Sequence, residues 1–114
     1  VAVDGGMGDN IRPALYGAEY DAVLAKDPNA PIAQNASIVG KFCESGDILI
    51  KDYDFPKTEP GDVIAMLSTG AYGYVMASNY NRNPRPAIVF VEDGKARLVV
   101  KRESYEDMIR NEIL

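Results

Sequence analysis

The residues with the clearest chemical potential are the chain's single cysteine, Cys43, and its neighbour Glu44, in the stretch KFCESGDIL. A free cysteine is most often a small buried hydrophobic residue, and that interpretation stays open here. A thiol beside a carboxylate is favoured in its neutral form, because a nearby negative charge disfavours the thiolate. Such a thiol suits a proton donor better than a nucleophile. An exposed Glu44 could pair with an ammonium group of a ligand or with an arginine of a partner.

A second pair, Arg12 and Tyr16, lies in the stretch DNIRPALYG. The stretch predicts a short helix with Asp9 as its N-cap, Pro13 in its first turn and Gly17 at its end. Residues four apart share a helix face, so the guanidinium could grip a carboxylate through two hydrogen bonds and the tyrosine could add a third. The spacing alone favours the plainer alternative, a surface arginine stacked on a tyrosine.

The third candidate is Tyr72, in the tyrosine-rich stretch GAYGYVMASNYN over residues 70–81. The small residues permit close approach to the backbone, and the hydroxyl of Tyr72 could reach a phosphate or a carboxylate. Packing of the ring with its hydroxyl in water is the alternative. The glycines at residues 5–8 do not match the spacing of dinucleotide or P-loop motifs, so they predict a tight turn after a strand.

The elements that must position these residues are mainly short strands. Segments rich in Val, Ile and aromatic residues, bounded by Gly, Pro, Asn or Asp, predict strands at residues 1–4, 20–25, 36–42, 47–52, 62–69, 87–92 and 96–102. This spacing is typical of a β-sandwich or a Greek-key barrel. The fold class is therefore mainly β, with a short helix near the start and another at the end.

Local signals refine this prediction at both ends of the strand region. Asp93-Gly94 between two apolar runs predicts a hairpin, and Pro60-Gly61 predicts a turn before a strand. Ser104, with Asp107 three residues later, resembles a capping box that opens a helix over residues 105–114. Its apolar face would carry Tyr105, Met108, Ile109 and Leu114.

Composition excludes several function classes. The 114 residues suit one domain, which we take as residues 1–114, and a net charge of −5 without a basic run disfavours nucleic acid as a partner. No apolar run approaches the length of a membrane span and no signal segment is present, so a cytoplasmic protein without membrane contact is expected. One cysteine and no histidine exclude a disulfide framework and a histidine triad, and leave almost nothing to hold a metal.

Four stretches, taken in order, resemble the C-terminal domain of diaminopimelate decarboxylases. They are VDGGMGDNIRPALYGAEY, GKFCESGDILIKD, EPGDVIAMLSTGAYGYVMASNYNRNPRPA and the closing hairpin with its helix, so the resemblance covers essentially the whole chain. Ile88 departs from it, because the family pattern has a glutamate after PRPA. The chain also opens at Val1 without a methionine, and we expect it to be a fragment of a longer protein.

The resemblance implies a pyridoxal 5′-phosphate enzyme of the alanine racemase and ornithine decarboxylase type. Such an enzyme has an N-terminal α/β barrel, whose lysine binds the cofactor covalently, and this C-terminal β-domain. It works as a homodimer with active sites at the subunit interface, and the implied reaction converts meso-2,6-diaminopimelate to L-lysine and carbon dioxide. None of the six lysines here lies in such a motif, so the 114-residue chain should be inactive alone.

Roles for individual residues also follow from the resemblance. Cys43 would donate a proton to the substrate Cα after decarboxylation, and Glu44 would bind the distal ammonium group, both in the active site of the partner subunit. Arg12 and Tyr16 would hold a substrate carboxylate, and Tyr72 would contact both substrate and cofactor. The alternatives are a related decarboxylase acting on another amino acid, and a non-catalytic β-domain that binds a partner and buries its cysteine.

Overall fold

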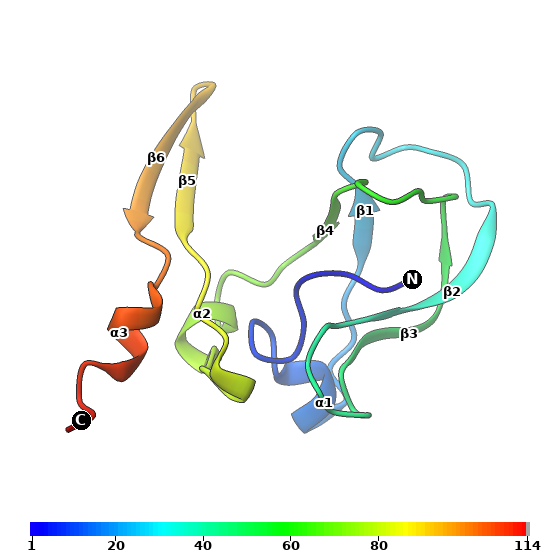
Figure 1. The fold of residues 1–114 in the computed structure, drawn as a ribbon. Helices are drawn as coiled ribbons and strands as arrows, with labels where there is room; N and C mark the ends of the chain where they lie inside the picture. The colour runs from blue at the N-terminus through cyan, green and yellow to red at the C-terminus, as the bar shows by residue number, and fades with distance from the viewer. Residues whose placement is uncertain (114) are drawn as a thin grey trace.

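The computed structural model of the protein describes residues 1–113, which form six short strands and four short helical pieces (Figure 1). The strands are β1 (Ala22–Leu24), β2 (Gln34–Val39), β3 (Ile48–Phe55), β4 (Ile64–Met66), β5 (Ile88–Glu92) and β6 (Lys95–Val100). The helical pieces are α1 (Arg12–Tyr16), α2 (Gly73–Met76), the 3₁₀ turn η1 (Tyr80–Arg82) and α3 (Tyr105–Ile109). The predicted fold class, mainly β with a short helix near each end, is confirmed.

The strands pair in twos. Within residues 1–113 they form three antiparallel ladders, β1 with β4, β2 with β3, and β5 with β6, and these ladders do not join into one sheet. The core gathers side chains of β1, β2 and β3: Ala22, Leu24, Ile38, Leu49 and Phe55. Ile38 and Phe55 are each only 1% exposed, so burial of these apolar side chains stabilises the packing of the β1–β4 ladder against the β2–β3 ladder.

The β5–β6 hairpin stands apart from the first four strands, and α2 lies near the base of β5 on the side that faces them (Figure 1). Its turn is the predicted one, because Asp93 and Gly94 have φ of 50° and 71°, the left-handed values that a tight hairpin turn requires. A cavity of about 1350 Å³ lies between the hairpin and the core strands. Its apolar lining includes Ile38, Leu49, Met66, Ile88, Phe90 and Val99, and it contains none of the five predicted site residues.

Three local predictions are wrong. Residues 1–4 do not form a strand, because only Ala2 bridges to Val39. Asp9 is not the N-cap of α1: Ile11 occupies that position without a side-chain cap, and Asp9 Oδ2 instead accepts the Gly6 N–H at 3.0 Å. The closing helix ends at Ile109 rather than at residue 114, and the predicted contribution of Leu114 to its apolar face lies outside the described residues.

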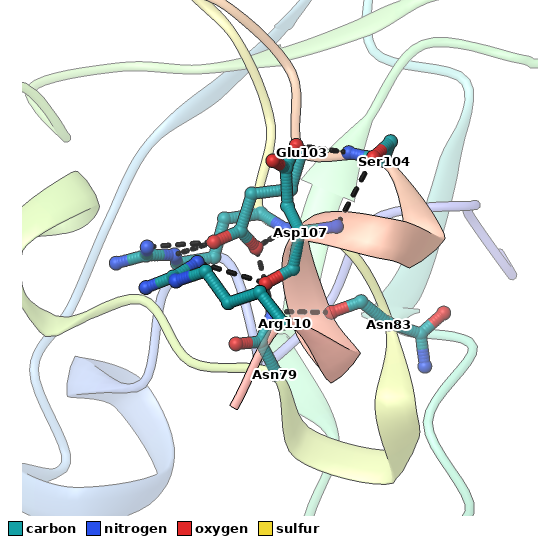
Figure 2. A network of polar contacts seen from close by, with 7 residues as sticks. Asn79, Asn83, Glu103, Ser104, Asp107 and Arg110 are labelled. Atoms are coloured by element: carbon teal, nitrogen blue, oxygen red, sulfur yellow. Dashed lines mark hydrogen bonds and ion pairs between the residues drawn. The ribbon is translucent and has the colours of Figure 1, made fainter. Parts of the chain in front are cut away.

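Other local predictions are confirmed. Gly17 ends α1 in the left-handed conformation with φ of 65°. Ser104 and Asp107 form the reciprocal capping box of α3 (Figure 2), with the Asp107 N–H donating to Ser104 Oγ at 3.1 Å and the Ser104 N–H to Asp107 Oδ2 at 2.8 Å. Gly61, with φ of 94°, makes the turn that precedes β4.

Glu103, between β6 and α3, ties the end of the chain to the segment before β5 (Figure 2). Its Oε1 accepts hydrogen bonds from Nε and Nη2 of Arg85 at 2.9 and 2.6 Å. Its Oε2 accepts the Arg85 N–H at 2.8 Å and Nδ2 of Asn79 at 2.6 Å. These hydrogen bonds, those from Arg85 first, lower the pKa of Glu103 to about 2.

We expect Glu103→Gln to lower the thermal midpoint of the complete protein in a pH-dependent way. The folded-state pKa of Glu103 lies below its ordinary value of 4.5, so its contribution is complete above about pH 4.5 and is lost as pH falls toward 2. Because the neutral amide would lose hydrogen bonds that are strengthened by charge, at a side chain only 11% exposed, the effect at neutral pH should be about 1–2 kcal/mol. Scanning calorimetry from pH 7 to pH 3 should show the midpoint difference narrowing below pH 4.5. The exposed Glu92→Gln is the control, and a difference independent of pH would contradict the expectation.

Candidate functional site

The candidate site rests on a buried carboxylate, Asp47, which is 4% exposed. Its Oδ1 accepts the Met7 N–H at 2.7 Å and its Oδ2 accepts the Phe42 N–H at 2.8 Å. It thereby joins the turn at residues 5–10 to the loop that carries Cys43. Glycine is needed at Gly40, because a Cβ there would lie 2.1 Å from Asp47 Oδ2.

Phe42 fills the space between this turn and the segment after α2. A Cβ at Gly8 would lie 2.4 Å from the Phe42 ring, so the ring packs directly on the Gly8 backbone. The Tyr80 ring also packs against the Phe42 ring, with ring centroids 6.0 Å apart and planes tilted by 60°. The Ser78 N–H also donates to the Gly8 carbonyl at 2.9 Å. Three segments far apart in the sequence are therefore held against one another.

Replacing Asp47 with asparagine should loosen this junction. Asparagine has one acceptor oxygen, so either the Met7 or the Phe42 N–H would face an amide NH₂ and lose its hydrogen bond. The loss should be about 2–3 kcal/mol, seen as a lower thermal midpoint and faster hydrogen exchange in residues 5–10 and 40–47 of the complete protein. Asp54→Asn on the exposed part of β3 is the matched control. Unchanged exchange in both segments would show that Asp47 is not the link between them.

The structure brings Arg12, Tyr16 and Tyr72 together. The guanidinium carbon of Arg12 lies 5.3 Å from the centroid of the Tyr16 ring and 4.7 Å from that of Tyr72. The predicted shared face of α1 is thus present, and the tyrosine stacking of the plainer alternative is present as well. Among residues 1–113 Arg12 forms no ion pair; its one side-chain hydrogen bond goes to Met76 Sδ at 4.0 Å.

This cluster is chemically suited to an anion. Tyr16 and Tyr72 are 62% and 57% exposed, so their hydroxyl groups are open to a ligand. Aromatic rings beside a guanidinium restrain it without neutralising it, which leaves its N–H groups able to grip a carboxylate or a phosphate.

Cys43 and Glu44 lie in a second cluster, with Tyr80 and Asn81. Cys43 is exposed, so the alternative that was left open, a small buried hydrophobic residue, is wrong. Its N–H donates to Asn81 Oδ1 at 2.8 Å. Glu44 Oε1 accepts the Gly46 N–H at 3.0 Å, and its Oε2 accepts the Tyr80 hydroxyl at 3.4 Å. Hydrogen bonds with neighbouring residues therefore fix the backbone of Cys43 and the carboxylate of Glu44.

Hydrogen bonding also sets the charge of this cluster. The Gly46 N–H, followed by the Tyr80 hydroxyl, lowers the pKa of Glu44, so this side chain is ionised at neutral pH. The pKa of Tyr80 is raised, first by burial and then by the negative charge of Glu44, so Tyr80 is a neutral hydrogen-bond donor. A fixed, accessible carboxylate of this kind can bind a cation such as an ammonium group.

Sequence reasoning missed Asp47, Tyr80 and Asn81 as parts of the site. The stretches containing them, CESGD and SNYN, are part of the family resemblance, but their long-range hydrogen bonds join residues 36 to 40 positions apart. The one signal in the sequence was the glycines that pack close to Asp47. They indicate that another group approaches the backbone closely, but they do not identify that group. Arg85, to which the sequence assigned no role, is the main partner of Glu103.

None of the helices within residues 1–113 is both long and apolar enough to span a membrane. Over the same range no group of three or more His, Cys, Asp or Glu side chains is placed to hold a metal ion.

Comparisons with known proteins place this geometry in a family. Residues 1–70 match the model of the "Pyridoxal-dependent decarboxylase, C-terminal sheet domain". The chain is 61% identical over 110 residues to the diaminopimelate decarboxylase of Bacillus subtilis, covering 96% of this chain and 25% of that protein.

Solved structures agree. The crystal structure of diaminopimelate decarboxylase from M. jannaschii is similar with a TM-score of 0.92 and 38% identity, over 100% of this chain and 26% of that one. The Helicobacter pylori enzyme complexed with L-lysine has a TM-score of 0.86 and 43% identity, over 96% and 27% of the two chains. The chain spans about a quarter of the length of the curated relatives it matches. By its sequence and its fold, the chain belongs to the family of C-terminal sheet domains of pyridoxal-dependent decarboxylases.

Proposed function

We propose that the chain is the C-terminal β-domain of a cytoplasmic diaminopimelate decarboxylase, which converts meso-2,6-diaminopimelate to L-lysine and carbon dioxide. The observation that carries this proposal is an exposed thiol and carboxylate, Cys43 and Glu44, held by hydrogen bonds, together with the half-buried cation Arg12 beside two exposed tyrosines, in a chain up to 63% identical to enzymes of that name. The relative from Helicobacter pylori holds L-lysine, the product of the proposed reaction.

The residues present fit pyridoxal phosphate as one component of the site. The exposed hydroxyl of Tyr72 and the nearby guanidinium of Arg12 are donors suited to phosphate or carboxylate oxygens. When bound, the cofactor supplies an electron sink for the electrons released as the carbon–carbon bond breaks. We assign its covalent lysine to a barrel domain in the rest of the protein, since none of the six lysines of this chain lies in the cofactor-binding motif that the family resemblance implies.

The substrate carries two ammonium and two carboxylate groups, so its recognition needs both signs of charge. Arg12, with the hydroxyl of Tyr16, would hold a carboxylate, and Tyr72 would contact substrate and cofactor together. Glu44 would bind the ammonium group at the unreactive end. A site that pairs each charge rejects analogues lacking one group, because the unmatched side chain would stay desolvated and unpaired.

Cys43 would complete the reaction. After carbon dioxide leaves, the former Cα needs a proton, and the exposed thiol is the donor that this chain offers. The sulfur–hydrogen bond breaks and a carbon–hydrogen bond forms, leaving a thiolate that solvent reprotonates. Because the thiol is at the surface, we assign it to the active site of a partner subunit in a homodimer, together with Glu44.

The deciding experiment is carbon dioxide release from meso-diaminopimelate by the complete protein with pyridoxal phosphate, with the 114-residue chain as control. Activity in the complete protein alone is expected. Activity with ornithine, arginine or lysine instead would move the assignment to another amino-acid decarboxylase. Failure to decarboxylate any of these amino acids, with cofactor bound, would favour a non-catalytic binding domain.

A further inference from the structure

The segment between α2 and β5 forms a short loop whose two ends meet on one side chain. Glu103 Oε2 accepts Nδ2 of Asn79 at 2.6 Å and the N–H of Arg85 at 2.8 Å. Its Oε1 also holds the Arg85 guanidinium. The Glu103 side chain is only 11% exposed, so water competes little for these contacts. Glu103 therefore fixes both ends of the loop over residues 79–85, and this restrains the residues at the tip of the loop.

The tip of this loop has an unfavourable backbone conformation. Asn81 and Arg82 follow one another with φ of 50° and 58°. Left-handed backbone costs roughly 1 kcal/mol or more for residues with a Cβ, although asparagine tolerates it better than most. Two such residues in succession persist only where the surroundings enforce them. Here the Asn81 side chain accepts a hydrogen bond from the Cys43 N–H at 2.8 Å, and this contact helps to hold the left-handed conformation.

The neighbouring Tyr80 also contacts the loop that carries Cys43 and Glu44, through its ring and its hydroxyl group. Its ring packs on buried Phe42, and its hydroxyl donates to Glu44 Oε2 at 3.4 Å. The Gly46 N–H occupies the other carboxylate oxygen of Glu44. Thus one residue of the loop fixes the backbone of Cys43, and the residue before it orients the carboxylate of Glu44.

We infer that Tyr80 and Asn81 are positioning residues, a clamp that holds the thiol of Cys43 and the carboxylate of Glu44 in their working geometry. This inference rests on the proposed function, because Cys43 and Glu44 act there as proton donor and ammonium ligand. The two halves of the clamp serve different steps. Loss of the Asn81 contact should slow proton delivery, whereas loss of the Tyr80 hydroxyl should weaken substrate binding.

Asn81→Gly in the complete holoenzyme tests the first half. Glycine keeps the left-handed backbone and removes only the acceptor for the Cys43 N–H. We expect kcat to fall about 10-fold with KM within about 2-fold, and the solvent isotope effect on kcat to rise, because a displaced donor makes proton transfer slower. Asp93→Gly, at φ of 50° in the hairpin turn, is the matched control and should leave kcat unchanged. An equal loss of kcat in both variants would overturn the inference.

A second readout does not need activity. Hydrogen exchange of the peptide over residues 41–49, measured by mass spectrometry, should be at least about 10-fold faster in Asn81→Gly at the Cys43 amide. Unchanged exchange, or faster exchange with an unchanged kcat, overturns the positioning role. If wild-type enzyme does not decarboxylate diaminopimelate, the proposed function fails instead, and the exchange rates alone then support or overturn the clamp.

Tyr80→Phe tests the second half, because it keeps the ring on Phe42 and removes the hydroxyl. The expected result is a KM for diaminopimelate raised about 3- to 10-fold with kcat nearly unchanged, the cost of one hydrogen bond to an ion at the surface. Tyr105→Phe, on exposed α3, is the control. A kcat loss without a KM change would show that Tyr80 does not act through Glu44.

Discussion

Cys43→Ala in the complete enzyme should lower kcat by about 10²- to 10⁴-fold, the usual contribution of a positioned proton donor, with little change in KM. Alanine removes the thiol, and the exposed position of Cys43 means that no core cavity is left. Cys43→Ser should fall between alanine and wild type, because a hydroxyl can donate but is a much weaker acid. Steady-state decarboxylation and the solvent isotope effect measure this. A normal kcat in Cys43→Ala would end the proton-donor assignment.

A mixed dimer separates action within a subunit from action across an interface. Subunits carrying Cys43→Ala are combined with subunits that lack the barrel lysine, each being inactive alone. Exchange at equal amounts makes half of the dimers mixed, with one intact site in two, so about a quarter of wild-type activity should return if Cys43 reaches the partner's site. No recovery would place Cys43 in the site of its own subunit.

Glu44→Gln should raise KM for meso-diaminopimelate by about 10- to 100-fold and reduce discrimination against analogues without the distal ammonium group. Glutamine preserves the shape and can still accept the Gly46 N–H, so the change removes mainly the negative charge. That charge is present throughout the neutral range, because hydrogen bonds lower the pKa of Glu44, and its loss should matter equally from pH 6 to pH 8.

The comparison that isolates this charge is Glu92→Gln, the same substitution on the exposed β5–β6 hairpin. It should leave KM unchanged, since the hairpin lies away from the site. Substrate titrations of both variants with diaminopimelate and with an analogue lacking one amino group give the result. Equal discrimination in Glu44→Gln and wild type would remove Glu44 from substrate recognition.

Local features were predictable from the sequence because their partners lie within a few residues. Asp93-Gly94 makes the hairpin turn, Gly17 ends α1, and Ser104 with Asp107 caps α3 as expected. Each depends on backbone conformations or hydrogen bonds over at most four positions, so residue type and spacing suffice.

Where local signals compete, the sequence alone was misleading. Asp9 has the right type for an N-cap, but the Gly6 N–H of the preceding turn captures its carboxylate. Residues 1–4 have the composition of a strand, yet only Ala2 finds a bridge partner. A strand or a cap needs an available partner as well as a suitable residue, and the path of the rest of the chain decides which partner is available.

The mainly β class, the hairpin turn at Asp93-Gly94, the end of α1 and the capping box of α3 therefore followed from residue type and spacing alone. Only the tertiary structure decided that Asp47 joins Met7 to Phe42, that Asn81 holds the backbone of Cys43, and that Glu103 closes the loop beneath it. The contact between Asp47 and Phe42 spans five positions, and the other contacts span 18 to 40 positions. The type of a polar side chain does not indicate which distant residue will be its partner. The partner is fixed when burial of the core brings separate loops together and each buried or half-buried polar group must find a hydrogen bond.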